Sequence, residues 1–339
     1  MKPTIKDVAK KANVSITTVS RALHGYDDVS PSTRKRVIKI AKDLGYTPNI
    51  LAQRLQKQRA DTIGLILPTF KPRFSDPFFS ELLAGIGNKA AELGFDLLVS
   101  TRAPGEQEVK TYQNLIEGAR VDGFIVVRTR EFDPRIAYLI EEGFSFAAFG
   151  RSKSNGSYAY VDEDGYYAMQ LVAEHIVSLG HKRIGCITSN ADQNFTRYRM
   201  NGLKDGLANH QISIDENIVR TGDLTQKSGY ELGKELLQHP DPPTMIVAFN
   251  DLMAFGVMSA AQELGLVVGR DLSVTGFDDI PMAEFSHPSL TTISQPVYQI
   301  GGMLCDILIK MVNKTLEEIP QIMLKPKLVI RKSTGKVNQ

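Results

Sequence analysis

The side chains with the most specific chemistry lie in residues 4–25, which read TIKDVAKKANVSITTVSRALHG. Within this segment, residues 16–23 have the apolar period of a helix, and Ser15 precedes them as a typical helix-capping residue. The face opposite the apolar one carries Ile16, Thr17, Ser20 and Arg21. An arginine can donate two parallel hydrogen bonds to guanine, and a short helix fits the DNA major groove. The pattern therefore predicts a base-reading helix.

The charge of the chain is divided unevenly. Residues 1–60 carry thirteen Lys and Arg against four Asp and Glu, a net charge of +9, whereas the rest of the chain carries 27 basic and 34 acidic residues, a net charge of −7. A basic segment on an acidic body is typical of proteins that bind nucleic acid through that segment alone. A basic run by itself would indicate only a solvated helical surface, but its combination with the helix favours DNA binding.

Further elements are needed to hold the base-reading helix. A preceding helix ends in a tight break at residues 12–14, and a third helix is predicted after Ser30 and Pro31, ending at Gly45. Residues 48–55 predict a helix of about two turns, which is unstable alone in water. We expect it to form only against its symmetry mate and DNA, with a polar linker after it.

The remainder of the 339 residues reads as an α/β body. Short apolar runs alternate with helical segments, which predicts parallel sheets with helices on both faces. Two doubly wound units of this kind leave a cleft at the carboxyl ends of their strands, where small ligands bind. The runs occupy residues 63–67, 96–100, 123–127 and 144–149 in a first set, and 183–189, 244–250 and 272–277 in a second.

Nothing in the sequence indicates catalysis, a metal or a bound cofactor. Residues 85–90, GIGNKA, match a dinucleotide motif but lie within a predicted helix rather than at a strand-to-helix turn. Asp278 and Asp279 are adjacent in an extended segment, so only one can reach a cleft, which favours ligand binding over acid–base catalysis. Cys186 and Cys305 lie in apolar runs and are expected to be reduced core thiols. Because no motif or residue pair gives a positive sign of catalysis, we expect a protein that is not an enzyme. Because no signal-peptide segment and no apolar run of ~20 residues is present, we expect it to be cytoplasmic.

Several motifs together resemble the lactose-repressor/galactose-repressor (LacI/GalR) family. They are the helix pair, VSPSTR at 29–34, LGYTPN at 44–49, FND at 249–251 and GFDD at 276–279. The resemblance extends from residue 2 to about residue 333. It implies an α-helical helix-turn-helix head followed by an α/β periplasmic-binding-protein-like body of two doubly wound parallel-sheet subdomains. It also implies a homodimeric, ligand-controlled transcription regulator, usually a repressor, that binds a roughly palindromic operator.

The resemblance divides the chain into four parts. The expected parts are a helix-turn-helix domain at 1–46, a hinge helix and linker at 47–61, an N-terminal effector-binding subdomain at 62–161 plus 291–322, and a C-terminal one at 162–290 plus 323–333. The chain has no leucine-heptad tail, which predicts a dimer rather than a tethered tetramer.

The resemblance also assigns the DNA contacts. Ile16, Thr17 and Arg21 match the family's base-reading positions, and Leu55 matches the leucine that enters the minor groove and kinks the DNA. A place in a core is the alternative for Ile16 and Leu55, but neither has an obvious core to join. The remaining predicted DNA contacts, several of them to phosphate, are Thr4, Ser15, Thr18, Ser20, Asn49 and Ala52.

For the effector, Arg199 and Asp278 match the family's ligand-binding arginine and aspartate, although a surface role is the alternative for Arg199. Leu224 departs from relatives that often have an aromatic residue there, so stacking would depend on Phe79 and Tyr160. Carboxylates, amides, arginines and aromatic rings together suit sugar recognition. The other predicted effector residues are Asp76, Arg102, Arg128, Asn250 and Gln295.

We therefore expect a repressor of carbohydrate-utilisation genes controlled by a small sugar. Residues 76–79, DPFF, and the arginine-rich cleft suggest an α-glucoside. Two alternatives stay open. A sugar-binding transport protein would share the body but need no basic head, and a purine-responsive, corepressor-type regulator would share both parts.

Overall fold

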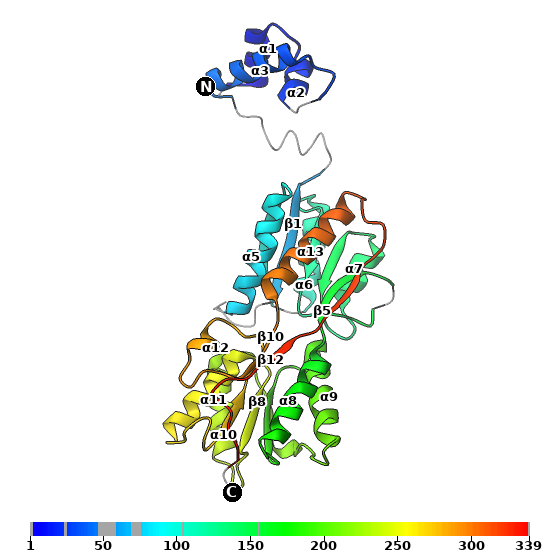
Figure 1. Cartoon of the computed structure of the whole chain (residues 1–339). Helices are drawn as coiled ribbons and strands as arrows, with labels where there is room; N and C mark the ends of the chain where they lie inside the picture. Colours follow the sequence, from blue (N-terminus) through cyan, green and yellow to red (C-terminus); the bar gives the residue numbers. More distant parts are fainter. Residues whose placement is uncertain are drawn as a thin grey trace. The chain divides into compact units, whose positions relative to one another are not determined.

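The structure is a computed structural model that describes residues 3–23, 26–46, 59–68, 76–103, 105–154 and 156–337 (Figure 1). The chain divides into two compact units, Met1–Ala60 and Asp61–Gln339, called here the head and the body. The predicted hinge helix with Asn49, Ala52 and Leu55 lies outside the described residues. The predicted fold class is confirmed, because a helical head precedes an α/β body with parallel sheets.

Three helices form the head, and one small apolar core joins them. Val8, Val19 and Val37, one from each helix, are fully buried in this core. Because Val19 and Ala22 of the second helix face inward, its opposite face is left at the surface. The helices are α1 (Ile5–Ala12), α2 (Ile16–Leu23) and α3 (Pro31–Leu44).

Helix α3 begins and ends at the predicted signals. Ser30 Oγ accepts a hydrogen bond from the backbone N–H of Thr33 at 3.3 Å, and Pro31 stands in the first turn. Gly45 ends the helix with a left-handed φ of 66°, where a side chain would be strained.

The first lobe of the body is built on a six-stranded sheet with the strand order β11-β5-β4-β3-β1-β2, and all neighbouring strands are parallel. Strand β1 is buried along its whole length because it lies inside the sheet with helices on both faces (Figure 1). The strands are β1 (Thr62–Pro68), β2 (Asp96–Arg102), β3 (Gly123–Val126), β4 (Phe146–Phe149), β5 (Ala159–Glu163) and β11 (Gln321–Leu324). One face is covered by α5 (Pro77–Glu92) and α13 (Val297–Val312), the other by α6 (Glu106–Glu117) and α7 (Pro134–Glu141).

The second lobe has a four-stranded parallel sheet with the order β7-β6-β8-β9 and a single apolar cluster around it. Its strands are β6 (Ile184–Thr188), β7 (Val219–Thr221), β8 (Met245–Ala248) and β9 (Ser273–Thr275). Its helices are α8 (Gly165–Ser178), α9 (Asn194–Ala208), α10 (Gln226–Leu237), α11 (Asp251–Glu263) and α12 (Met282–Phe285), with a 3-10 turn at Glu216–Ile218.

Three short segments link the lobes, at residues 163–165, 294–297 and 324–327. A two-stranded antiparallel sheet of β10 (Thr292–Ser294) and β12 (Lys327–Val329) lies beside two of these links (Figure 1). Because the chain crosses between the lobes at these points, the carboxyl ends of both parallel sheets meet at the same place.

The predicted strands are present, with shorter bounds in places. Strand β4 begins at Phe146 rather than at residue 144, and strands β5, β7, β10, β11 and β12 were not predicted. Cys186 and Cys305 are free and buried, as expected. No helix in the described ranges has the length and hydropathy to cross a membrane.

Candidate nucleic-acid surface and ligand cavity

The outward face of α2 carries the three predicted base-reading residues. Ile16, Thr17 and Arg21 are all exposed, and Ile16 keeps 44% of its surface open to solvent although it is a large apolar residue. An isoleucine exposed on a polar helix face contributes nothing to the core of the head, and its methyl groups are free to contact a thymine methyl.

Two of the residues whose hydroxyls are predicted to contact DNA, Thr4 and Ser15, also cap helices. Thr4 donates its backbone N–H and its hydroxyl to Asp7 Oδ2 at 2.8 and 2.7 Å, and these hydrogen bonds lower the pKa of Asp7. Ser15 Oγ accepts from the backbone N–H of Thr18 at 3.0 Å and contacts its hydroxyl at 2.8 Å. These residues therefore stabilise the two helix starts, whatever else they contact. Ser20 is half-buried.

Arg21 contacts two residues of the segment between α2 and α3. Its Nη1 lies 2.6 Å from Asp28 Oδ2, and its guanidinium carbon lies 5.8 Å from the centre of the Tyr26 ring. Both partners of the ion pair are about half exposed, so the pair is worth only ~0–1 kcal/mol. A guanine could therefore replace Asp28 as the partner of Arg21 at little cost.

In the body, a cavity of about 70 Å³ lies between the two lobes. Its lining comes from the carboxyl ends of strands in both sheets and from the starts of the helices that follow them, as predicted for a doubly wound fold. Seven of the nine predicted effector residues line it: Asp76, Phe79, Arg128, Arg199, Asn250, Asp278 and Gln295.

Arg199 is the central cation of this cavity. It is 5% exposed, its Nη1 donates to the Phe249 carbonyl at 2.5 Å and its Nη2 to Glu163 Oε1 at 3.0 Å. The same guanidinium lies 4.0 Å from Asp278 Oδ1 and stacks over the Phe277 ring at 3.3 Å. The alternative of a surface arginine is therefore wrong.

Asp278 and Gln295 form a second polar pair next to Arg199. Gln295 Nε2 donates to Asp278 Oδ1 at 2.9 Å, while Gln295 Oε1 and Arg199 Nε are buried and have no hydrogen-bond partner among the described residues. Burial raises the pKa of Asp278 well above its usual value, although Arg199 opposes the shift. One buried acceptor and one buried donor beside the cavity therefore have hydrogen-bonding capacity that the described residues do not use. The neighbouring Asp279 instead pairs with Arg331 at 2.7 Å, so only one member of the carboxylate pair reaches the cavity, as predicted.

The first lobe contributes Asp76, Phe79 and Arg128. Asp76 caps α5 by accepting from the backbone N–H of Phe78 at 3.1 Å, and its other oxygen lies 3.4 Å from Arg128 Nη2. The Arg128 guanidinium also lies 4.8 Å from the centre of the Phe79 ring. Burial raises the pKa of Asp76 and lowers that of Arg128, and each group opposes the shift of the other.

Asn250 is committed on both sides of its amide. Its Oδ1 accepts from the backbone N–H of Met253 at 3.0 Å and so caps α11, and its Nδ2 donates to the Leu224 carbonyl at 2.9 Å. This amide fixes the loop that carries Leu224 at the cavity wall.

Comparison with known proteins agrees with both parts of the structure. The family model for bacterial regulatory proteins of the lacI family matches residues 4–49, and the model for a periplasmic binding protein-like domain matches residues 173–334. The HTH-type transcriptional repressor CytR of Escherichia coli strain K12 is 37% identical over 302 residues, which cover 88% of this chain and 86% of CytR. The chain belongs to the LacI family.

Two solved structures of related regulators match nearly the full length of the chain. The lac repressor dimer bound to operator and the anti-inducer ONPF has a TM-score of 0.87 and 29% identity, covering 99% of this chain and 100% of that one. The complex of the transcriptional regulator CelR with cellobiose has a TM-score of 0.74 and 30% identity, covering 98% and 99%. This LacI-family member is therefore a DNA-binding transcription regulator, and its named relatives are regulators rather than enzymes.

The sequence interpretation missed several residues of the cavity of this LacI-family protein. Asp162 and Glu163 end strand β5, whose mixed composition hid it, and Arg151 Nε donates to Asp162 Oδ2 at 2.6 Å. Burial, and then the neighbouring Glu163, raise the pKa of Asp162 to about 7. The Arg151 guanidinium also lies 4.1 Å from the centre of the Tyr198 ring. The other missed lining residues of polar or aromatic type are Phe78, Thr129, Phe149, Asn194 and Phe195.

Two of the predicted effector residues do not line the cavity. Arg102 ends β2, the edge strand of the first sheet, where it is exposed and donates to Thr111 Oγ1 at 3.1 Å. Tyr160 lies on β5 two residues before Asp162, so its ring stays within the apolar cluster under α7, 6.0 Å from the Tyr158 ring. Strand order corrects the first expectation, and distance from the strand end corrects the second.

Counted over the described residues, the lining of the cavity is nearly balanced in charge. It holds three guanidinium groups and four carboxyl groups, and each guanidinium faces a carboxyl group at 2.6 to 3.4 Å. Within the described part of the chain, no cluster of His, Cys, Asp and Glu has the grouping needed to hold a metal ion. The arrangement can bind hydrogen-bond donors at its carboxylates and cover apolar ligand surface with its rings.

Proposed function

We propose that this LacI-family regulator represses carbohydrate-utilisation genes and is controlled by a small sugar in the inter-lobe cavity. In this proposal the protein binds a palindromic operator as a homodimer, and the sugar acts as an inducer that weakens operator binding. An α-glucoside is the first ligand to test.

The observation that carries the proposal is the chemistry of the cavity. A sugar hydroxyl can donate to Gln295 Oε1 and accept from Arg199 Nε, two buried groups that have no partner in the described part of the chain. Phe78, Phe79 and Phe149 supply apolar ring surface for the C–H faces of a sugar. The relative CelR was solved in complex with cellobiose, which supports a sugar as the ligand of this chain.

The charge of the cavity favours an uncharged sugar over a sugar phosphate. Among the described lining residues each arginine already has a carboxylate partner, so a phosphate would meet Asp76, Asp162, Glu163 and Asp278 with no unpaired guanidinium among those residues. Like charges at close range in a partly desolvated site cost several kcal/mol. The hydroxyl groups of a neutral sugar, in contrast, can donate to these carboxylates.

A groove on the second lobe supports homodimerisation. It has a volume of about 700 Å³, and its apolar rim includes Phe285, 73% exposed, and Met282, 47% exposed. Apolar side chains gathered in this way are typical of protein interfaces. A second copy of this chain is the partner that a palindromic operator requires, since two half-sites need two heads.

Two assays test the proposed function. Operator duplexes selected from a random pool by the wild-type protein should bind specifically in a gel shift, and loss of all specific binding would favour a sugar-binding transport protein. A thermal-shift panel of maltose, cellobiose, glucose, glucose 6-phosphate, guanine and adenosine should give a neutral sugar as a hit, because a ligand stabilises the folded state it binds. That sugar should release the operator. A purine hit that strengthens operator binding would replace the proposal by the corepressor alternative.

The dimer is tested separately. Phe285→Ser should convert a dimer into a monomer in sedimentation velocity, because it removes the most exposed ring of the groove. Ile330→Ser removes another apolar side chain, 61% exposed and outside the groove, and should leave the dimer intact. A dimer that both variants keep would place the contact elsewhere.

A further inference from the structure

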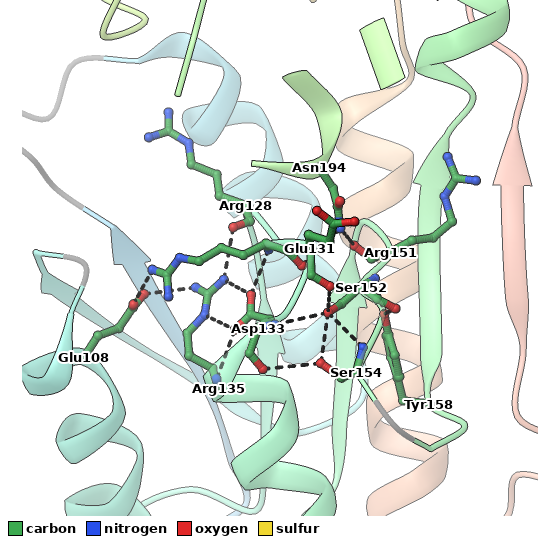
Figure 2. A network of polar contacts seen from close by, with 11 residues as sticks. Glu108, Arg128, Glu131, Asp133, Arg135, Arg151, Ser152, Ser154, Tyr158 and Asn194 are labelled. Carbon is green, nitrogen blue, oxygen red and sulfur yellow. Dashed lines mark hydrogen bonds and ion pairs between the residues drawn. The ribbon is translucent and has the colours of Figure 1, made fainter. Parts of the chain in front are cut away.

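The segment that follows strand β3, residues 127–133, contacts three different parts of the body. Val127, Arg128 and Thr129 line the cavity. Arg130 and Asp133 join a cluster of buried charges within the first lobe. The same segment also forms hydrogen bonds with residues 192–197 of the second lobe (Figure 2).

Arg135 is at the centre of the buried charges. Its side chain is fully buried, which is rare for arginine and requires complete pairing. Nε donates to Asp133 Oδ1 at 2.9 Å, Nη1 to Glu108 Oε1 at 3.0 Å, and Nη2 to Asp133 Oδ2 at 2.6 Å. Nη2 also donates to the backbone carbonyl of Arg128 at 3.0 Å. The other oxygen of Glu108 accepts from Arg130 Nη2 at 2.6 Å. The cluster therefore forms hydrogen bonds with residues 128, 130 and 133 of the segment.

Three successive backbone carbonyl groups of this segment, at residues 128–130, accept hydrogen bonds from donors in two different lobes. The carbonyl of Arg128 accepts from Arg135, as described, whereas those of Thr129 and Arg130 accept from Asn194 of the second lobe. The backbone N–H of Asn194 donates to Thr129 at 3.1 Å, and its Nδ2 donates to Arg130 at 3.0 Å and to the Arg151 carbonyl at 2.5 Å. Asn194 is only 3% exposed, so these contacts are protected from water.

A second contact between the lobes is weaker. Glu131 forms ion pairs with Arg197 of the second lobe and with Lys153 of its own lobe, the latter at 2.7 Å. The Glu131 side chain is 34% exposed, and exposed ion pairs contribute little. The buried amide of Asn194 therefore carries most of the contact between the lobes at this point.

We propose that Arg135 is a positioning residue that couples the effector cavity to the closure of the two lobes. Its guanidinium fixes the carbonyl of Arg128, and with it the conformation in which the next two carbonyls meet Asn194. A ligand that contacts the Arg128 side chain therefore acts on the same short segment that contacts Asn194. The role in ligand control rests on the proposed function, whereas the effect of Arg135 on lobe closure does not.

The experiment measures the distance between the lobes in the full-length protein without ligand. Spin labels are attached to cysteines introduced at Glu117 in the first lobe and Lys227 in the second, which are exposed, while the two native cysteines are buried. Pulsed electron–electron double resonance then gives the distribution of distances between the two spin labels. Asn194→Ala should lower the ratio of closed to open molecules by roughly five-fold for each hydrogen bond lost, because a net hydrogen bond is worth about 1 kcal/mol.

The decisive variant is Arg135→Lys. Lysine keeps the charge but not the planar fork that reaches Asp133, Glu108 and the Arg128 carbonyl together. We expect it to open the lobes as Asn194→Ala does, although the hydrogen bonds of Arg135 all stay within the first lobe. A purely structural role would lower the melting temperature and leave the distance distribution unchanged, and this result would overturn the proposal.

Two further variants complete the test. Glu108→Gln keeps the shape of the cluster and removes one charge, so it serves if Arg135→Lys does not fold. A folded Glu108→Gln protein with wild-type distances would also overturn the proposal. Glu216→Gln removes the surface ion pair with Lys204, 2.6 Å long and within the second lobe, and should leave the distances unchanged. Operator binding is measured separately from the distance between the lobes. If Arg135→Lys opens the lobes but the wild type binds no operator, the proposed function is refuted and the role of Arg135 in lobe closure stands.

Discussion

Arg21, the arginine on the outward face of α2, forms an ion pair with Asp28 at 2.6 Å. The residue best suited to read guanine is therefore partnered by a carboxylate of its own head. When the protein binds DNA, a base has to replace this carboxylate as the partner of Arg21. The exchange costs little free energy because the ion pair is exposed to solvent.

Removing that carboxylate should strengthen DNA binding. In Asp28→Asn, Arg21 no longer has to break an ion pair, so affinity for a selected operator should rise by about two- to five-fold, matching the ~0.5–1 kcal/mol of an exposed pair. Asp27→Asn removes the same charge one residue away and controls for the general attraction of phosphate. Fluorescence anisotropy at fixed salt measures both variants. Equal gains for the two would mean that the pair with Arg21 does not matter, and a loss for Asp28→Asn would mean that Asp28 orients Arg21.

Replacement of Arg199 should remove ligand response and keep DNA binding. Lysine cannot bond both the Phe249 carbonyl and Glu163 while it stacks on Phe277, so Arg199→Lys should bind the sugar hit at least ~10-fold more weakly. Isothermal titration calorimetry gives the affinity, and a gel shift without sugar gives DNA binding.

Arg183→Lys is the matched control for Arg199→Lys. Arg183 lies in the same lobe and pairs with Asp215 at 3.2 Å and with Asp241 at 3.0 Å, outside the cavity. Its substitution should leave sugar affinity unchanged. Wild-type sugar affinity in Arg199→Lys would show that the ligand does not use the central cation of the cavity.

The difference between predicted and missed elements follows from what a sequence can encode locally. Strand β1 has a continuous apolar run because helices cover both its faces, so its sequence identifies it. Strand β5 ends in Asp162 and Glu163, which face the cavity, so it lacks that run and both carboxylates escaped notice. Polar residues that serve a binding site interrupt the apolar pattern by which a strand is predicted from the sequence.

Strand order explains the wrong expectation for Arg102. In the sequence, Arg102 and Arg128 each come shortly after a predicted strand, at residues 96–100 and 123–127. Only the order β3-β1-β2 puts the end of β2 at the sheet edge and the end of β3 next to the cavity. The ion pair of Arg21 with Asp28 and the cluster around Arg135 depend in the same way on side chains that meet only after folding.

The stability of the body should depend on pH through Asp162. Burial raises its pKa in the folded protein to about 7, whereas the unfolded chain has the ordinary value of 3.8. Between these values the folded state holds a proton that the unfolded state has released, so stability falls as pH rises through this window and levels off above about pH 7. The effect is on the order of 1 kcal/mol for each pKa unit.

Asp162→Asn isolates this contribution, because asparagine does not titrate. The melting temperature of the wild type minus that of Asp162→Asn should fall from pH 5 to pH 8. The half-buried His175 and the buried His181, whose pKa values desolvation lowers, act in the opposite direction but are present in both proteins and cancel. Asp271→Asn is the control, since Arg270 lowers the pKa of Asp271 to about 2, below the tested range. A difference that stays constant or rises for Asp162→Asn would contradict an elevated pKa.

The two glycines of the GIGNKA segment should respond oppositely to alanine. Both lie in α5, as predicted, but a Cβ on Gly85 would stand 2.0 Å from the Tyr298 carbonyl oxygen of α13, whereas a Cβ on Gly87 meets nothing within 4 Å. Gly85→Ala should therefore destabilise the body by about 1–3 kcal/mol through forced separation of the two helices. Gly87→Ala should stabilise it by roughly 0.5–1 kcal/mol, because alanine loses less backbone entropy in a helix. Urea denaturation of both variants measures these changes. Equal effects would mean that α5 and α13 do not approach as closely as the structure has them, and loss of a bound dinucleotide in either variant would restore the cofactor interpretation of the motif.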